Sequence, residues 1–162
     1  MSEVMMKNPA PSIEEKPVPQ DGPRPRAARV LVVEDERHIA RFLEFILKKE
    51  GYQVAIAYDG EQALGVVDQF APDAILLDMV LPGISGLDVL KRLRADRRHA
   101  HRVIVVLSAS LFGDLPAEVM EAGANTHCTK PIAPSDLLKK LAEFGVPPVI
   151  DEDAPASSAH RQ

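Results

Sequence analysis

The sequence has little that could form covalent cross-links or aromatic clusters. It contains one cysteine, Cys128, no tryptophan and 4% aromatic residues among 162 positions. A lone cysteine cannot form an internal disulfide, which excludes the disulfide framework of a small secreted domain. No run approaches the eighteen or so apolar residues of a membrane span, and the first residues lack the apolar core of a signal peptide. These absences predict a soluble, cytoplasmic protein without a membrane partner.

Positive charge is also scarce. The 19 Lys and Arg residues are outnumbered by 24 Asp and Glu residues, for a net charge of -5. Nucleic-acid binding usually shows as a basic stripe or patch, and we therefore expect no direct contact with nucleic acid. Glycine is missing from "VVEDERH", where a dinucleotide-binding enzyme would need a glycine-rich turn after its first strand.

Both ends of the chain differ in composition from the middle. Residues 1–28 hold six of the fourteen prolines mixed with charge, so they bury too little to offset their ordering entropy. The stretch 145–162 opens with Gly and two prolines and then turns acidic. We interpret these ends as a disordered proline-rich arm and a flexible acidic tail. The remaining residues, 29–144, suffice for one globular domain.

Within this domain, short β-branched runs alternate with stretches of helical spacing. In the first helix, for example, Ile39, Phe42, Leu43, Ile46 and Leu47 share that spacing. Strands are expected at 29–33, 52–57, 74–78, 102–108 and 125–128, and helices at 36–51, 60–70, 87–97, after 116 and at 134–144. Continuous apolar strands that are each followed by a helix predict a parallel sheet covered on both faces. Right-handed crossovers then favour an α/β fold, a doubly wound five-stranded sheet.

Polar residues follow the strands where each one ends. In "AILLDMVLPGISG" the apolar run ends at Asp78, and the first strand runs into Glu34 and Asp35. Ser108 ends the fourth strand, and Lys130 follows the fifth. Since ligands of such sheets bind beyond the carboxyl ends of the strands, we expect these side chains to meet.

These carboxylates, with a lysine and a hydroxyl, suggest metal binding and phosphoryl transfer. Clustered carboxylates raise one another's pKa, and a divalent cation relieves the repulsion. Oxygen ligands of this kind suit Mg²⁺. With a lysine and a hydroxyl to contact phosphoryl oxygens, Asp78 could act as a nucleophile and form an acyl phosphate.

The four segments "LVVEDE", "LLDMVLPGISG", "VVLSAS" and "CTKPI" resemble the receiver domain of two-component response regulators, in the family's order, over about residues 29–144. The resemblance implies a flavodoxin-like receiver fold and a protein that is no enzyme beyond its own phosphorylation and dephosphorylation. Its phosphodonor would be a histidine kinase or a histidine phosphotransfer protein.

The resemblance also assigns roles to individual residues. Asp78 matches the phosphoacceptor, Ser108 the switch hydroxyl and Lys130 the lysine that pairs with the phosphoryl group. The Mg²⁺ ligands would be Asp35, Asp78, the backbone carbonyl of Val80 and, through water, Glu34. The Lys130–Pro131 bond matches the family's cis peptide.

One position departs from the family pattern, and two others bear on how long the phosphoryl group is kept. His127 stands where the family usually has Tyr or Phe, and its charge depends on pH near neutrality. We expect altered output coupling with phosphorylation intact, although His127 could equally be only a half-exposed strand residue. Val80 and Ser110 flank the approach of water to Asp78, and neither can orient it, so rapid self-dephosphorylation is not expected.

The output of such a protein would be contact with another protein. Eighteen residues follow Phe144, too few for a DNA-binding domain, and we therefore expect a stand-alone regulator of the chemotaxis or phosphorelay type. The expected target face is 115–144. The alternatives are an interaction module that no longer takes phosphate, and a regulator whose effector is a separate chain tethered by the proline-rich arm. A haloacid-dehalogenase-type phosphatase would need a second Asp where Val80 stands.

Overall fold

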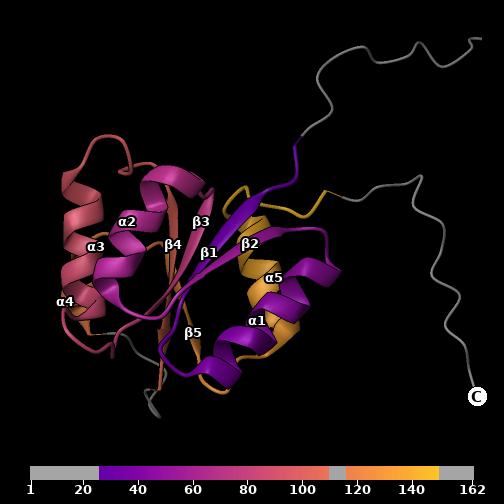
Figure 1. Ribbon diagram of the computed structural model, residues 1–162, viewed down its shortest axis with the longest axis horizontal. Coiled ribbons are helices and arrows are strands. Elements are labelled where there is room, and N and C mark those ends of the chain that lie inside the picture. The colour runs from indigo at the N-terminus through magenta and orange to yellow at the C-terminus, as the bar shows by residue number, and fades with distance from the viewer. Residues whose placement is uncertain (1–25, 110–115, 150–162) are drawn as a thin grey trace, which may run out of the picture.

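A parallel five-stranded sheet in the order β2-β1-β3-β4-β5 forms the centre of the molecule. The computed structural model describes residues 26–109 and 116–149 (Figure 1). The strands are β1 (Arg29–Val33), β2 (Gln53–Ala57), β3 (Ala74–Asp78), β4 (Val103–Ser108) and β5 (Thr126–Thr129). The helices are α1 (Arg37–Lys49), α2 (Gly60–Phe70), α3 (Gly86–Ala95), α4 (Ala117–Glu121) and α5 (Pro134–Glu143).

Helices cover both faces of the sheet. Figure 1 shows α1 and α5 on one face and α2, α3 and α4 on the other. Successive strand residues point to opposite faces, so Val30 and Val32 of β1 pack under α1 and α5, while Leu31 and Val33 pack under α2 and α3. The predicted doubly wound α/β fold is confirmed.

The inner face of α1 differs from the predicted apolar stripe. Its buried residues are Ala40, Leu43, Ile46 and Leu47, whereas Phe42 is 46% exposed. The stripe of apolar residues is therefore wider than the face that the sheet covers, and the aromatic residues at its margin remain in contact with solvent.

Helix α3 begins one residue earlier than predicted. The side chain of Ser85 caps the helix by accepting a hydrogen bond from the backbone N–H of Asp88, so Gly86 already belongs to the first turn. The helix ends at Ala95, because Asp96 accepts a hydrogen bond from the backbone N–H of Arg98 and starts a turn.

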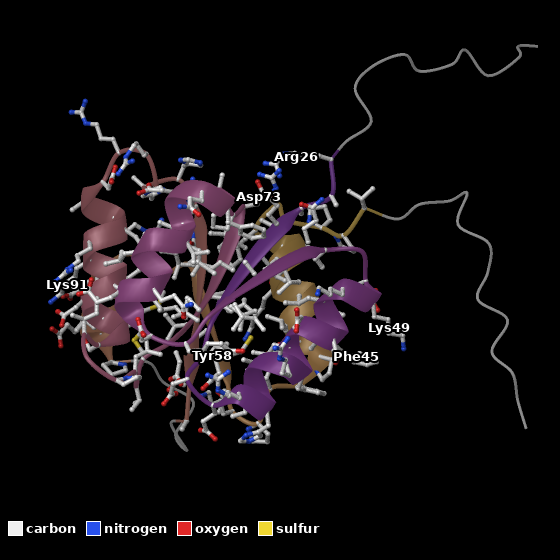
Figure 2. The ribbon with its side chains drawn as sticks, viewed as in Figure 1. Arg26, Phe45, Lys49, Tyr58, Asp73 and Lys91 are labelled. Carbon is white, nitrogen blue, oxygen red and sulfur yellow. The ribbon has the colours of Figure 1, made fainter. Side chains whose placement is uncertain are left out.

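The described chain packs beyond both ends of the predicted domain. Arg26 forms an ion pair with Asp73 at 2.9 Å, and Figure 2 shows the two side chains meeting at the start of the sheet. At the other end, Val146 is 5% exposed, and its carbonyl accepts a hydrogen bond of 2.6 Å from the Tyr52 hydroxyl. The rest of the predicted arm and tail, residues 1–25 and 150–162, lies outside the described residues.

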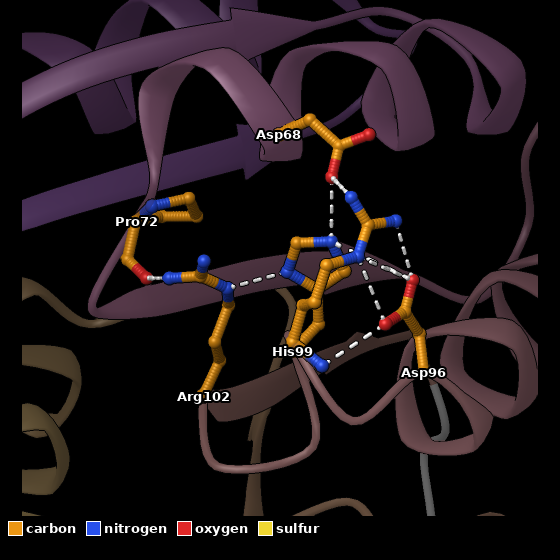
Figure 3. A network of polar contacts seen from close by, with 6 residues as sticks. Asp68, Pro72, Asp96, His99 and Arg102 are labelled. Atoms are coloured by element: carbon orange, nitrogen blue, oxygen red, sulfur yellow. Dashed lines mark hydrogen bonds and ion pairs between the residues drawn. The ribbon is translucent and has the colours of Figure 1, made fainter.

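The connection between α3 and β4 is held by a polar network around His99, which is 4% exposed. His99 Nδ1 accepts a hydrogen bond of 2.9 Å from Arg102 Nε, and Nε2 lies 2.8 Å from Asp68 of α2 (Figure 3). Since arginine can only donate, the imidazole proton lies on Nε2 and points to Asp68. Arg102 also donates to the Pro72 carbonyl, which ties this loop to the segment before β3.

Candidate functional site

The predicted polar residues meet at the carboxyl edge of the sheet. Glu34 and Asp35 follow β1, Asp78 ends β3, and one carboxylate oxygen from each lies within 4.8 Å of the others. Glu34 is fully buried, whereas Asp35 and Asp78 border an open pocket of about 470 Å³. Its lining residues are Asp35, Glu36, Asp78, Met79, Val80, Leu107, Ser108, Ala109 and Lys130. The expectation that residues of four strands converge here is confirmed for the acids, Ser108 and Lys130.

Lys130 joins two of the carboxylates. Its Nζ lies 2.7 Å from Glu34 Oε2 and 2.8 Å from Asp78 Oδ2. The backbone N–H of Lys130 donates to the Ser108 carbonyl at 2.7 Å, so the lysine is anchored on β4. Burial alone would lower the pKa of Lys130, but the hydrogen bonds to Asp78 and Glu34 outweigh burial and raise it. Lys130 is therefore a fixed cation in the pocket.

Glu34 is the most deeply buried acid of the site. Its side chain is fully buried, and its Oε1 accepts a hydrogen bond of 3.2 Å from the Glu36 backbone N–H. Burial raises the pKa of Glu34 to about 6, and the charge of Asp78 adds to this rise, while Lys130 and the Glu36 N–H lower it. The acid is thus costly to ionise without a cation beside it.

Asp78 is held in one orientation. It is 5% exposed, its Oδ1 accepts a hydrogen bond of 3.0 Å from the Val80 backbone N–H, and its Oδ2 pairs with Lys130. Val80 itself is 78% exposed at the pocket mouth. Gly86 packs directly behind, because a Cβ at that position would lie 2.1 Å from the Asp78 carbonyl oxygen.

Sequence reasoning did not identify Gly86 or the two backbone N–H donors of Glu36 and Val80. The N–H groups carry no side-chain signal. The only sequence signal for Gly86 was the "SG" pair, in which a capping serine precedes a glycine that helix propensity alone would disfavour.

The remaining predicted residues lie around the site or outside the described chain. His127 does not line the pocket; it is half-buried on β5, and its carbonyl accepts a hydrogen bond from Lys140 Nζ. The Lys130–Pro131 bond is cis, as predicted. Ser110 and Leu115 lie outside the described residues.

The donor set fits Mg²⁺. The cluster of Glu34, Asp35 and Asp78 has one ammonium group beside it among the described residues that line the pocket, that of Lys130, so negative charge remains in excess. Hard carboxylate oxygens at the open end of a pocket are the ligands that Mg²⁺ takes together with water. The acidic cluster is typical of the Mg²⁺ site of receiver domains.

The match to a family model identifies the class of protein. The model of the response regulator receiver domain matches residues 30–142, and the chain belongs to this family. The chain thus contains a receiver domain, a signalling module rather than a conventional enzyme, and its acidic pocket is consistent with phosphorylation on aspartate.

Curated relatives include the DNA-binding response regulator MtrA. The chain is 38% identical over 113 residues to MtrA of Mycobacterium tuberculosis, covering 70% of this chain and 48% of the relative. The MtrA of Mycolicibacterium paratuberculosis matches at the same identity over 49% of its length. The chain spans about half the length of the curated relatives that it matches.

Solved structures agree with this family. The chemotaxis response regulator CheY4 of Vibrio cholerae superposes with a TM-score of 0.68 at 29% identity, covering 72% of this chain and 98% of that one. A CheY-like receiver domain from Methylobacillus flagellatus gives 0.66 at 29% identity, with the same coverage of both chains. Among residues 26–109 and 116–149, no helix has the length and apolar character needed to cross a membrane.

Proposed function

We propose that this chain is a phosphoryl-accepting response regulator that works through Asp78 and Mg²⁺. The observation that carries the proposal is the pairing of Lys130 with Glu34 and Asp78 beside the exposed Asp35. One cation that serves two buried acids leaves the site short of positive charge, which a metal ion and the oxygens of a phosphoryl group together can use.

Each residue of the pocket would have a separate role in phosphoryl transfer. An Asp78 oxygen forms the O–P bond while the P–N bond of a phosphohistidine donor breaks, and the leaving imidazole takes up a proton. The Val80 N–H and Lys130 orient the carboxylate before attack. Lys130 then pairs with a phosphoryl oxygen, and the Ser108 hydroxyl, which lines the same pocket, donates to another. Ser108 would thereby act as the switch residue.

The metal ligands follow from the same arrangement. The groups proposed to hold Mg²⁺ are the carboxylates of Asp35 and Asp78, the Val80 backbone carbonyl and, through water, Glu34. Bound there, Mg²⁺ would neutralise the carboxylates and the transferred phosphoryl oxygens.

The proposed donor is a histidine kinase or a histidine phosphotransfer protein, and the proposed output is contact of the 115–144 face with another protein in the cytoplasm. The proposal includes a single-domain regulator; the receiver domain itself is what the chain shares with both CheY4 and MtrA. It would bind neither DNA nor membrane directly, and it would lose its phosphoryl group slowly, since Val80 offers no group to orient water.

The test of the acceptor uses acetyl phosphate as the phosphodonor and intact mass as the readout. With Mg²⁺, the wild type should gain one phosphoryl group, and Asp78→Asn should gain none. The matched control is Asp88→Asn, an exposed acid on α3 outside the pocket, which should react like the wild type. If the folded wild type gains no phosphoryl group, the proposal fails in favour of a phosphorylation-independent interaction module.

His127 is proposed to influence output rather than phosphorylation. It lies on β5 three residues before Lys130 and outside the pocket lining. His127→Tyr should therefore accept a phosphoryl group at the wild-type rate but bind a partner of the 115–144 face with changed dependence on phosphorylation. Unchanged partner binding in both states would reduce His127 to a structural strand residue.

A further inference from the structure

Helix α1 has an exposed face that is both aromatic and basic. Phe45 is 65% exposed, and Figure 2 shows it and Lys49 pointing away from the body of the molecule. Between these side chains lies a shallow groove of about 540 Å³, lined by Arg41, Glu44, Phe45, Lys48 and Lys49. Phe45 thus gives the groove an apolar surface among charged side chains.

The charges of the groove define the kind of group that could cover it. Glu44 accepts from Arg41 at 2.9 Å and from Lys48 at 2.7 Å, and hydrogen bonds from Lys48 and Arg41 lower the pKa of Glu44. Lys49 has no ion-pair partner among residues 26–109 and 116–149. Three cations thus share one carboxylate, in a chain with a net charge of -5. An acidic segment suits this groove, whereas the same face of a second copy would repel it.

The path of the described chain leads to this groove. After α5, Val146 is buried beside Tyr52, and the chain then reaches the turn that follows α1. There the Val149 carbonyl oxygen lies 3.0 Å from the position that a Cβ on Gly51 would take. The chain therefore leaves the described region at the carboxyl end of α1, one turn from Lys48 and Lys49.

The sequence that follows is acidic. Residues 150–153 read Ile-Asp-Glu-Asp, with three carboxylates in a row. Four extended residues span about 13 Å. Along the helix axis, Phe45 is about 9 Å from Gly51. Lys48 and Lys49 are closer still to Gly51, so the acidic residues are within reach of these two cations.

We propose that Asp151, Glu152 and Asp153 dock in the groove on α1, where they pair with Lys48 and Lys49 and cover Phe45. Surface ion pairs are weak and screened by salt, so this cover is reversible. Helix α1 begins at Arg37, two residues after Asp35 of the acidic pocket. A protein that approaches the pocket along α1 has to displace the acidic segment, which makes the segment a competitor for that surface. The contact does not depend on phosphorylation of Asp78.

The first experiment is carbodiimide cross-linking of the full chain, which joins an amine to a carboxylate with loss of water. Mass spectrometry of the monomer should find Lys48 or Lys49 linked to residues 151–153, and about 1 M salt, where the Debye length is about 3 Å, should suppress the link. The internal control is Lys91 and Glu118, an ion pair of 3.5 Å between α3 and α4. Formation of the control link without the α1 link overturns the proposal. A link found only in species of dimer mass does so too, and assigns the groove to a second copy.

The second experiment compares two charge-matched variants of the full chain by the amide chemical shifts of residues 45–49. Asp151→Asn/Glu152→Gln/Asp153→Asn should shift these amides, whereas Glu3→Gln/Glu14→Gln/Glu15→Gln, which removes three acids near the other end, should leave them unchanged. Equal shifts in both variants would show a general charge effect and overturn the proposal. Both experiments use the unphosphorylated protein. A negative result would therefore contradict the docking proposal without bearing on Asp78 as the phosphoacceptor.

Discussion

Gly86 places the acceptor carboxylate through backbone contact alone. A Cβ there would lie 2.1 Å from the Asp78 carbonyl oxygen and 2.7 Å from the Met79 Cα. Both neighbours are backbone atoms, which cannot rotate away as a side chain can. Gly86 thus allows α3 to start against the end of β3, where Asp78 meets Lys130.

Gly86→Ala should therefore lower the free energy of unfolding and the rate of phosphoryl transfer together. Forcing one extra carbon into a packed site typically costs about 1–3 kcal/mol. The backbone of Asp78 must move, and its carboxylate then meets Lys130 less well. Urea unfolding monitored by circular dichroism gives the first quantity, and the rate of mass gain with acetyl phosphate gives the second.

Gly65→Ala is the matched control for this change. Gly65 is exposed within α2, and a Cβ there meets nothing within 4 Å. Alanine favours a helix interior by roughly 0.5–1 kcal/mol over glycine, so this variant should be more stable and should react normally. If the two alanine variants behaved alike, the close approach at Gly86 would not matter.

For single residues, the sequence predicts which side chains belong to the site better than it predicts which backbone groups contact them. Glu34, Asp35, Asp78 and Lys130 could be selected because charged residues at the ends of apolar strands are rare. Sequence could not show that Lys130 bridges two acids, since this depends on a separation of 52 residues from Asp78. The Val80 N–H could not be found at all, because every residue but proline carries the same group.

Arg94 connects α3 to the loop before β4 and to the loop between α4 and β5. Its guanidinium donates four hydrogen bonds of 2.7–2.9 Å. The acceptors are the carbonyls of Ala100, Arg102 and Gly123 and the side chain of Asn125. Burial lowers the pKa of Arg94, as expected for a cation whose partners are dipoles.

Arg94→Lys should destabilise the protein by about 2–3 kcal/mol, although charge is retained. A compact ammonium cannot serve four acceptors that are spaced for a planar guanidinium, and the acceptors it misses lose their charge-assisted hydrogen bonds. The midpoint of urea unfolding measures the change. Arg97→Lys, at an exposed position after the same helix, should stay within about 0.5 kcal/mol of the wild type. Equal midpoints for the two variants would contradict this role of Arg94.

The bounds of a helix or strand could be predicted where the local sequence pattern sets them. They could not where contacts with distant residues decide which residue ends the element. The strands 29–33 and 74–78 and the helix 60–70 were predicted with the observed bounds. The fifth strand was placed at 125–128 but runs from Thr126 to Thr129. The reason is that the side chain of Asn125, rather than its backbone carbonyl, accepts from the Ile104 N–H of β4, and it also accepts from Arg94 of α3.

For the whole molecule, the two ends of the described chain close on the same edge of the sheet. Arg26, Asp73, Val146 and Val149 line one pocket of about 400 Å³ there. The alternation of apolar runs predicted the fold class, because it fixes the number of layers. It could not show that Val146 belongs to the core, because a single valine after Gly145 and before two prolines has no periodic neighbours.

The contact between Tyr52 and Val146 spans 94 residues of sequence and predicts an alkaline loss of stability. Burial, with the charge of Glu50 second, raises the pKa of Tyr52 from 10.0 to about 12. The folded state therefore holds this proton more tightly than the unfolded state. The stability that depends on the protonated Tyr52 hydroxyl is fully present below pH 10 and is lost as the pH rises through 12. At pH 11, a shift of this size corresponds to a loss of about 1.4 kcal/mol.

Comparison with Tyr52→Phe isolates this effect, because every other titrating group is common to both proteins. At pH 8 the variant should be less stable by about 1 kcal/mol, since the Val146 carbonyl loses its hydrogen bond. Between pH 10 and pH 11 the advantage of the wild type should shrink toward zero, because only the wild type must keep a buried phenol protonated. Urea unfolding at both pH values provides the measurement. A wild-type advantage that stays constant to pH 11 would mean that the Tyr52 hydroxyl is open to solvent, and that residues 145–149 do not seal this end of the core.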